Sequence, residues 1–153
     1  MTAKPVVRVQ AQDFDTAKEL EAMTKGQTNI GAVVSFTGLC RDEGGVLEAL
    51  ELEHYAGMAT AQLNDIAQQA CKRWPLEHLL VIHRYGKIPP GKNIVLVIAT
   101  SSHRQAAFDG ASFVMDFLKT NAPFWKKEHF KDGSTGQWVE AKDKDDKARD
   151  RWD

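Results

Sequence analysis

Two apolar, β-branched runs joined by a short turn constrain this chain more than any other feature. The runs cover residues 79–84 and 94–100, and Pro89-Pro90-Gly91 lies between them. This triplet is typical of a turn between two strands. Because strands connected by so short a segment form a hairpin, the pattern favours an α+β domain with an antiparallel sheet over a doubly wound parallel sheet.

Further strands and helices are expected around this hairpin. Residues 6–9 form a short strand candidate, and Thr16 with Glu19 offers a capping box for a helix that stops near Gly26. Residues 31–38 and 47–55 are predicted to be two strands joined by a long hairpin loop at 41–45.

The strongest helix pattern precedes Pro75, where apolar residues recur at helical spacing at Leu63, Ile66, Ala67, Ala70, Cys71 and Trp74. A third helix is predicted over 102–120. After it, residues 125–130 and 137–140 are expected to close the fold as a hairpin through Gly133. The tail at 142–153 alternates in charge and is expected to be a solvated helix or a frayed end.

Length and charge exclude several classes of protein. A chain of 153 residues fits one domain over 1–153, and 20 basic against 21 acidic residues give no bulk charge for nucleic acid or a membrane surface. No apolar run is long enough to span a bilayer, so we expect a cytoplasmic protein. Two cysteines match no disulfide framework, and the histidines have no metal-ligand spacing, so no metal and no cofactor are predicted.

The start of the third helix is a candidate anion site. Ser102 and Gln105 form a potential capping box that places His103 and Arg104 in the first turn, beside free N–H groups and the positive end of the helix dipole. A surface arginine with a capping histidine explains the same residues about equally well. Arg41, in the loop after a strand, is a second candidate for a functional cation, although its local sequence alone favours a solvated loop arginine.

Three lysines surround the other end of the same helix, in aromatic and apolar company: Lys119, Lys126 and Lys127. Such lysines serve as proton carriers or nucleophiles, or they are solvated cations near the negative end of the helix dipole. His103 and Lys119 are 16 residues apart, about 24 Å along one continuous helix. They therefore belong to one site shared by two copies of the chain, to two separate sites, or to a site at only one end.

Five segments together resemble the MoaE family, the large catalytic subunits of molybdopterin synthase, over about residues 6–152. The segments are SFTGLCR (35–41), LEHYAGM (52–58), VIHRYG (81–86), TSSHR (100–104) and MDFLKTNAPFWKKE (115–128). The resemblance implies a hammerhead-type α+β fold and a dimer of large subunits within a heterotetramer. Each large subunit then holds a small ubiquitin-like carrier, whose C-terminal Gly-Gly thiocarboxylate gives sulfur to cyclic pyranopterin monophosphate.

The resemblance also implies the residues of the pocket. Lys119 and Lys126 are expected to be the catalytic residues, Lys119 with a central proton-transfer and electrostatic role and Lys126 as the partner that binds substrate. The other residues implied in substrate binding are Leu39, Cys40, Arg41, Lys127 and Glu128, with His103 and Arg104 from the neighbouring large subunit. A sulfur relay through Cys40 is not required by the family's chemistry. Two other functions fit the residues: a Schiff-base enzyme using Lys119, and a phosphate-binding module using the helix start at His103.

Overall fold

The computed structural model describes residues 3–55, 57–120, 124–139 and 152. The elements follow one another as β1 (Val6–Gln10), α1 (Thr16–Thr24), β2 (Ala32–Leu39), a 3₁₀ turn (Glu43–Gly45), β3 (Leu47–His54), α2 (Met58–Arg73), β4 (Leu76–Arg84), β5 (Gly86–Ile88), β6 (Asn93–Ser101), α3 (Arg104–Thr120) and β7 (Phe124–Phe130). Within this part of the chain, no helix is long and apolar enough to cross a membrane.

The strands form two sheets, and the α+β class predicted from the sequence is confirmed. The larger sheet has the order β1-β4-β6-β2, and the smaller one has the order β5-β3-β7. β4 and β6 are antiparallel, as their connecting turn predicts. β1 and β4 are parallel, and they become neighbours only after the chain has passed through α2.

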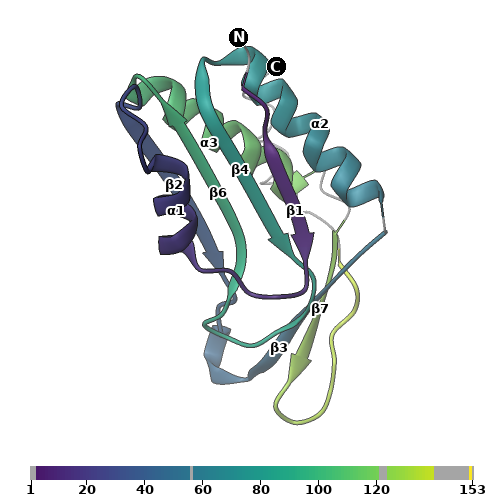
Figure 1. The fold of residues 1–153 in the computed structure, drawn as a ribbon. Helices are drawn as coiled ribbons and strands as arrows, with labels where there is room; N and C mark the ends of the chain where they lie inside the picture. The colour runs from purple at the N-terminus through teal and green to yellow at the C-terminus, as the bar shows by residue number, and fades with distance from the viewer. Residues whose placement is uncertain (1–2, 56, 121–123, 140–151, 153) are drawn as a thin grey trace.

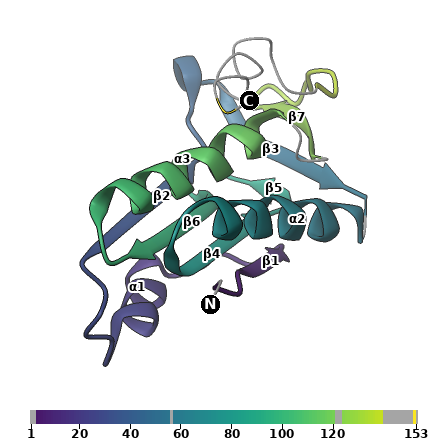
Figure 2. The same cartoon turned by 90° about the horizontal axis from the view of Figure 1, so that it is seen from above.

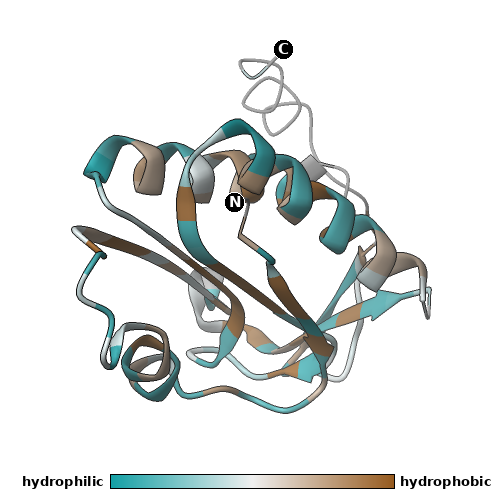
Figure 3. Cartoon of the chain, turned by 45° about the horizontal axis from the view of Figure 1, so that its top comes forward, coloured by the Kyte–Doolittle hydropathy of each residue, from teal (hydrophilic) through white to brown (hydrophobic). Residues whose placement is uncertain are grey.

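Helices cover both faces of the larger sheet, α2 and α3 on one side and α1 on the other (Figures 1 and 2). On β4, Val81 packs in the cluster that includes residues of α2 and α3, whereas Ile82 packs against residues from the α1 side. The central strands are therefore apolar on both faces, visible as brown ribbon in Figure 3. This double coverage explains why β4 and β6 appear as continuous apolar runs and not as alternating ones.

Two predicted helix starts are wrong in detail. The side chain of Asp15, not Thr16, accepts the capping hydrogen bond at α1, from the Lys18 N–H at 3.2 Å. The Ser102–Gln105 capping box does not form either. The Ser102 hydroxyl donates to the Asn29 carbonyl oxygen at 3.3 Å, and the Gln105 amide donates to Asp109 at 3.0 Å.

The predicted hairpin of β2 and β3 is also wrong. β2 pairs with β6 in the larger sheet, whereas β3 lies between β5 and β7 in the smaller one. The short strand β5, placed inside the expected turn region, was not predicted. The closing hairpin through Gly133 is confirmed as far as Val139, which exchanges two backbone hydrogen bonds with Lys126 at 2.9 and 3.1 Å. Glu140 and the tail at 142–153, apart from Trp152, lie outside the described residues.

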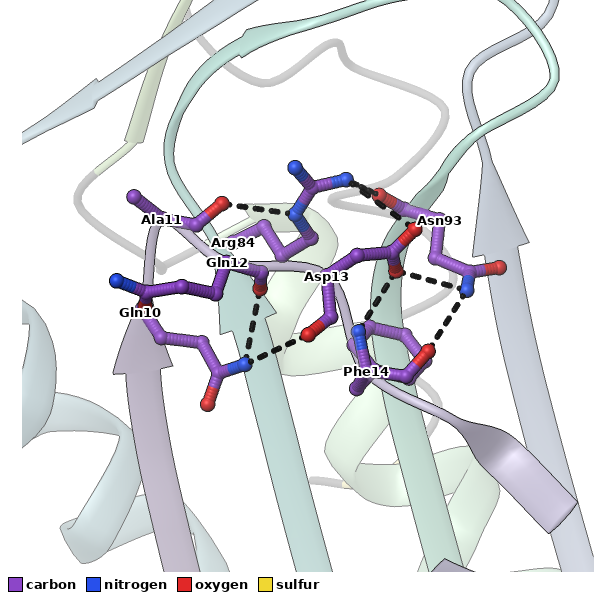
Figure 4. Close-up of polar contacts among 7 residues, drawn as sticks. All are labelled: Gln10, Ala11, Gln12, Asp13, Phe14, Arg84 and Asn93. Carbon is purple, nitrogen blue, oxygen red and sulfur yellow. Dashed lines mark hydrogen bonds and ion pairs between the residues drawn. The ribbon is translucent and has the colours of Figure 1, made fainter. Parts of the chain in front are cut away.

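Arg84, the last residue of β4, fastens the connection between β1 and α1 to the large sheet (Figure 4). Its guanidinium donates to the Ala11 carbonyl oxygen at 3.0 Å and to the Asn93 carbonyl oxygen at 2.8 Å. The Asn93 amide in turn donates to the Asp13 carboxylate at 2.9 Å. These contacts fix the end of β4, where the chain passes from the large sheet into the small one.

Candidate active site

A narrow pocket lies where the two sheets meet the C-terminal end of α3. Its volume is about 60 Å³, and β3, β4, β6, α3 and β7 contribute residues to its wall. The lining residues are Leu50, Leu52, His83, Ile94, Val95, Met115, Leu118, Lys119, Phe124 and Lys126. Two ammonium groups and one imidazole therefore face a space whose remaining walls are apolar.

Strand register explains which residues of β7 reach this pocket. Lys126 is paired with Leu52 and Glu128 with Leu50, so these two side chains share the pocket face of the small sheet. Lys127 is paired with Glu51 and lies on the opposite face. Its ammonium lies 5.4 Å from the centre of the Trp138 ring, a cation–π contact outside the pocket.

Lys119 reaches the pocket from the last turn of α3, directly after the buried Leu118. Carbonyl groups at a helix C-terminus carry a partial negative charge, which favours a cation at this position. Lys119 is exposed and also lines the pocket, so we place its ammonium at the pocket mouth.

His83 is the pocket residue that the sequence interpretation missed. It is only 8% exposed, its ring stacks on Phe124 with centroids 3.8 Å apart, and its Nδ1 lies 2.8 Å from the Arg84 carbonyl oxygen. Burial lowers the pKa of the His83 imidazole to about 4, and the positive charges of Lys119 and Lys126 act in the same direction. Two signals in the sequence could have found it: a polar residue near the end of an apolar run, and its place in the segment VIHRYG (81–86).

Cys40 follows β2 and is held by backbone bonds to the turn between β5 and β6: its N–H donates to the Lys92 carbonyl oxygen at 2.8 Å, and its own carbonyl accepts from Gly91 at 2.7 Å. The thiol is buried. Burial raises the pKa of the Cys40 thiol, and the nearby Asp42 and Glu128 carboxylates raise it further. Its neighbours Leu39 and Arg41 are exposed.

His103 and Arg104 lie at the opposite end of α3 from Lys119, and both are exposed. α3 is one continuous helix, which keeps the two ends about 24 Å apart. The structure thus brings Lys119 and Lys126 together, with Glu128 on the same sheet face. It does not bring His103, Arg104 or Lys127 into the same pocket of one chain. Within the described ranges, no group of His, Cys, Asp and Glu could hold a metal ion.

Comparison with known proteins decides the family. The family model for the MoaE protein matches residues 9–121. The chain belongs to the MoaE protein family. Relatives named molybdopterin synthase catalytic subunit include those of Mesorhizobium japonicum, 64% identical over 97% of this chain and 93% of the relative, and Rhizobium meliloti, 62% identical over 99% and 98%. Membership places this MoaE chain in molybdenum cofactor biosynthesis, among molybdopterin synthase catalytic subunits.

Solved structures agree with this assignment and confirm the hammerhead-type α+β fold expected for a MoaE protein. The MoaE protein of Burkholderia ambifaria has a TM-score of 0.83 at 44% identity, covering 97% of both chains. Molybdopterin synthase of Staphylococcus aureus has a TM-score of 0.76 at 30% identity, covering 86% of this chain and 95% of that one. A complex of subunits 1 and 2 of molybdopterin-converting factor from Helicobacter pylori, at 21% identity and a TM-score of 0.72, shares the fold and covers 90% of each chain.

Proposed function

We propose that this chain transfers sulfur from the C-terminal thiocarboxylate of a small ubiquitin-like carrier to cyclic pyranopterin monophosphate, forming the dithiolene of molybdopterin. One observation carries the proposal: Lys119 and Lys126 converge from two different elements on a narrow pocket with apolar walls. The MoaE membership of the chain supports the same reaction.

The pocket suits the end of a glycine tail better than it suits a pterin. The pocket is narrow, and two glycines bring no side chains into it. We therefore expect the thiocarboxylate to enter the pocket and the pyranopterin to lie at its mouth. Leu39, Cys40 and Arg41, at the end of β2, are proposed to border the substrate there, together with Glu128.

Fixed positive charge is what this chemistry requires. The thiocarboxylate is anionic, and its sulfur first bonds to a substrate carbon in place of an oxygen, which leaves as water. Water then adds to the carbonyl carbon of the resulting thioester, so that negative charge develops on the carbonyl oxygen. The carrier's carbon–sulfur bond breaks, which leaves the sulfur on the substrate as a thiolate and the carrier's terminus as a carboxylate. Ammonium groups at Lys119 and Lys126 stabilise both charges, and they act more strongly beside apolar walls than in water. Lys119 is assigned the central electrostatic and proton-transfer role, and Lys126 the binding of substrate.

A second copy of the chain is proposed to complete the site. Arg104 is the first residue of α3 and His103 precedes it, so the positive end of the helix dipole and a guanidinium are available there for the substrate phosphate. Since they cannot reach Lys119 of their own chain, they would serve the pocket of a neighbouring subunit in a dimer. Lys127 lies on the face of β7 that is turned away from the pocket. It is proposed to contact the substrate only through another group or after a change of conformation.

The test is a reconstitution. The purified chain, a thiocarboxylated carrier and cyclic pyranopterin monophosphate should yield molybdopterin, and Lys119→Ala should lower the rate roughly 10²- to 10³-fold while the protein stays folded. A folded wild-type chain that binds the substrate without turnover would contradict the proposal and favour a binding module. Borohydride trapping of the substrate on Lys119 without any carrier would favour Schiff-base chemistry.

A further inference from the structure

His83 combines three constraints that together fix the orientation of its ring. The face of the imidazole is held by Phe124, at an interplanar angle of 12°. One edge is held by the contact from Nδ1 to the Arg84 carbonyl oxygen, at 2.8 Å. The carbonyl belongs to a residue that is itself fixed by its guanidinium contacts to Ala11 and Asn93. A carbonyl can only accept, so Nδ1 carries the proton and Nε2 presents a lone pair.

The neutral form of the ring follows from its surroundings. The charged and titratable groups that face His83 are Lys119 from α3, Lys126 from β7 and His54 from β3. Each of them disfavours a positive charge on the His83 ring. The ring is also buried, which acts in the same direction. Near neutral pH, Nε2 is therefore a hydrogen-bond acceptor inside a pocket that otherwise carries cations.

Lys119 offers the matching donor. Across the part of the chain that the structure describes, its ammonium makes no hydrogen bond or ion pair, and His83 Nε2 likewise has no hydrogen-bond partner. Both residues line the same small pocket. The lysine side chain can turn about four bonds, whereas the imidazole is fixed, so it is the ammonium that must move to make the contact.

We propose that His83 is a positioning residue for Lys119: its Nε2 accepts a hydrogen bond from the Lys119 ammonium and directs that group toward the reacting carbonyl. A rotamer-rich side chain would otherwise sample many positions at the mouth of the pocket. One N–H bound to a neutral acceptor leaves the other two N–H groups to face the substrate. The catalytic value of this contact rests on the proposed function, whereas its existence does not.

Nitrogen-15 NMR of histidine side chains in the intact protein tests the contact without any turnover. We expect His83 to carry its proton on Nδ1, to remain neutral down to about pH 5, and to show a changed Nε2 shift in Lys119→Ala. Lys127→Ala, which removes an equal charge on the far face of β7, should leave the Nε2 shift unchanged. A proton on Nε2, or equal shifts in the two variants, would overturn the proposal.

Kinetics then tests the positioning role. His83→Phe keeps a flat ring against Phe124 but removes the acceptor, and His83→Gln retains an acceptor oxygen. We expect His83→Phe to lose roughly 10- to 100-fold in kcat with little change in KM, the size expected for a hydrogen bond to a charged group. His83→Gln should retain most of the activity. In a Lys119→Ala background, His83→Phe should cost nothing further.

A purely structural role gives a different pattern. It would lower the thermal stability of both His83 variants, and the cost of His83→Phe would persist in the Lys119→Ala background. Either result would refute positioning through Lys119. A wild-type chain that makes no molybdopterin would refute the proposed function instead, and the NMR result would still stand or fall independently.

Discussion

Mixing two inactive variants is the sharpest test of a pocket shared between subunits. α3 runs unbroken from Arg104 to Thr120, so Arg104 and Lys119 are separated by 15 residues, about 22 Å along the axis. A small substrate cannot touch both in one chain. Arg104→Ala and Lys119→Ala should each be nearly inactive alone, and their hybrid dimer should contain one pocket built wholly from unmutated residues.

The expected recovery of activity follows from the fraction of pockets that carry no mutation. Random mixing makes about half of the dimers hybrids, and each hybrid has one intact pocket of two, so about a quarter of wild-type activity should return. A hybrid purified through two different affinity tags should reach about half. Molybdopterin formation is the assay, and native mass spectrometry counts the hybrids.

A matched control uses two residues of the same pocket. Lys119→Ala mixed with Lys126→Ala leaves every hybrid pocket with one mutation, so no activity should return. If the Arg104→Ala and Lys119→Ala hybrids form and remain inactive, the shared pocket is refuted. Recovery in the control mixture would instead show that Lys119 and Lys126 do not act in the same pocket.

Three further predictions concern chemistry and stability. Cys40→Ala should retain sulfur transfer within about threefold, since a buried thiol with a raised pKa is a poor nucleophile; loss of activity in a folded variant would revive a relay. Gly31→Ala places Cβ 2.1 Å from the Ser102 carbonyl oxygen and should cost roughly 1–3 kcal/mol in urea unfolding, whereas Gly136→Ala, with its nearest atom at 3.8 Å, should be near neutral. The His83 pKa, about 4 in the folded chain against about 6.5 unfolded, implies stability that is present above pH 6.5 and falls by about 3 kcal/mol toward pH 4; His83→Phe should flatten this profile.

Local patterns predicted the elements well because their causes are local. The i, i+3, i+4 spacing before Pro75 gave α2, whose buried residues include Leu63 and Ile66. The β4 and β6 runs were read correctly because both of their faces are covered. Such local patterns do not specify which distant strands pair, and the predicted pairing of β2 with β3 was therefore wrong.

The site shows the same division between local and long-range information. Lys119 and Lys126 stand out beside a helix end in an aromatic segment, and the structure places both at one pocket. The register of β7 against β3, which turns Lys127 to the other face, depends on a pairing that the sequence did not reveal. The position of His83 in the pocket was not predicted for a related reason. Its ring is held by stacking on Phe124, which is 41 positions away in sequence.

The distribution of charge bears on whether the sulfur comes from an external donor or from a cysteine of this chain. The Cys40 thiol lies near two carboxylates, Asp42 and Glu128, which together with burial keep it protonated. Lys119 and Lys126, by contrast, bring positive charge to an apolar pocket. An arriving thiocarboxylate is already ionised and needs stabilising cations more than a base, whereas a cysteine relay would need its cations beside the thiol. The chain places positive charge at the pocket and negative charge beside its own sulfur, and this arrangement supports the proposed delivery of sulfur from outside.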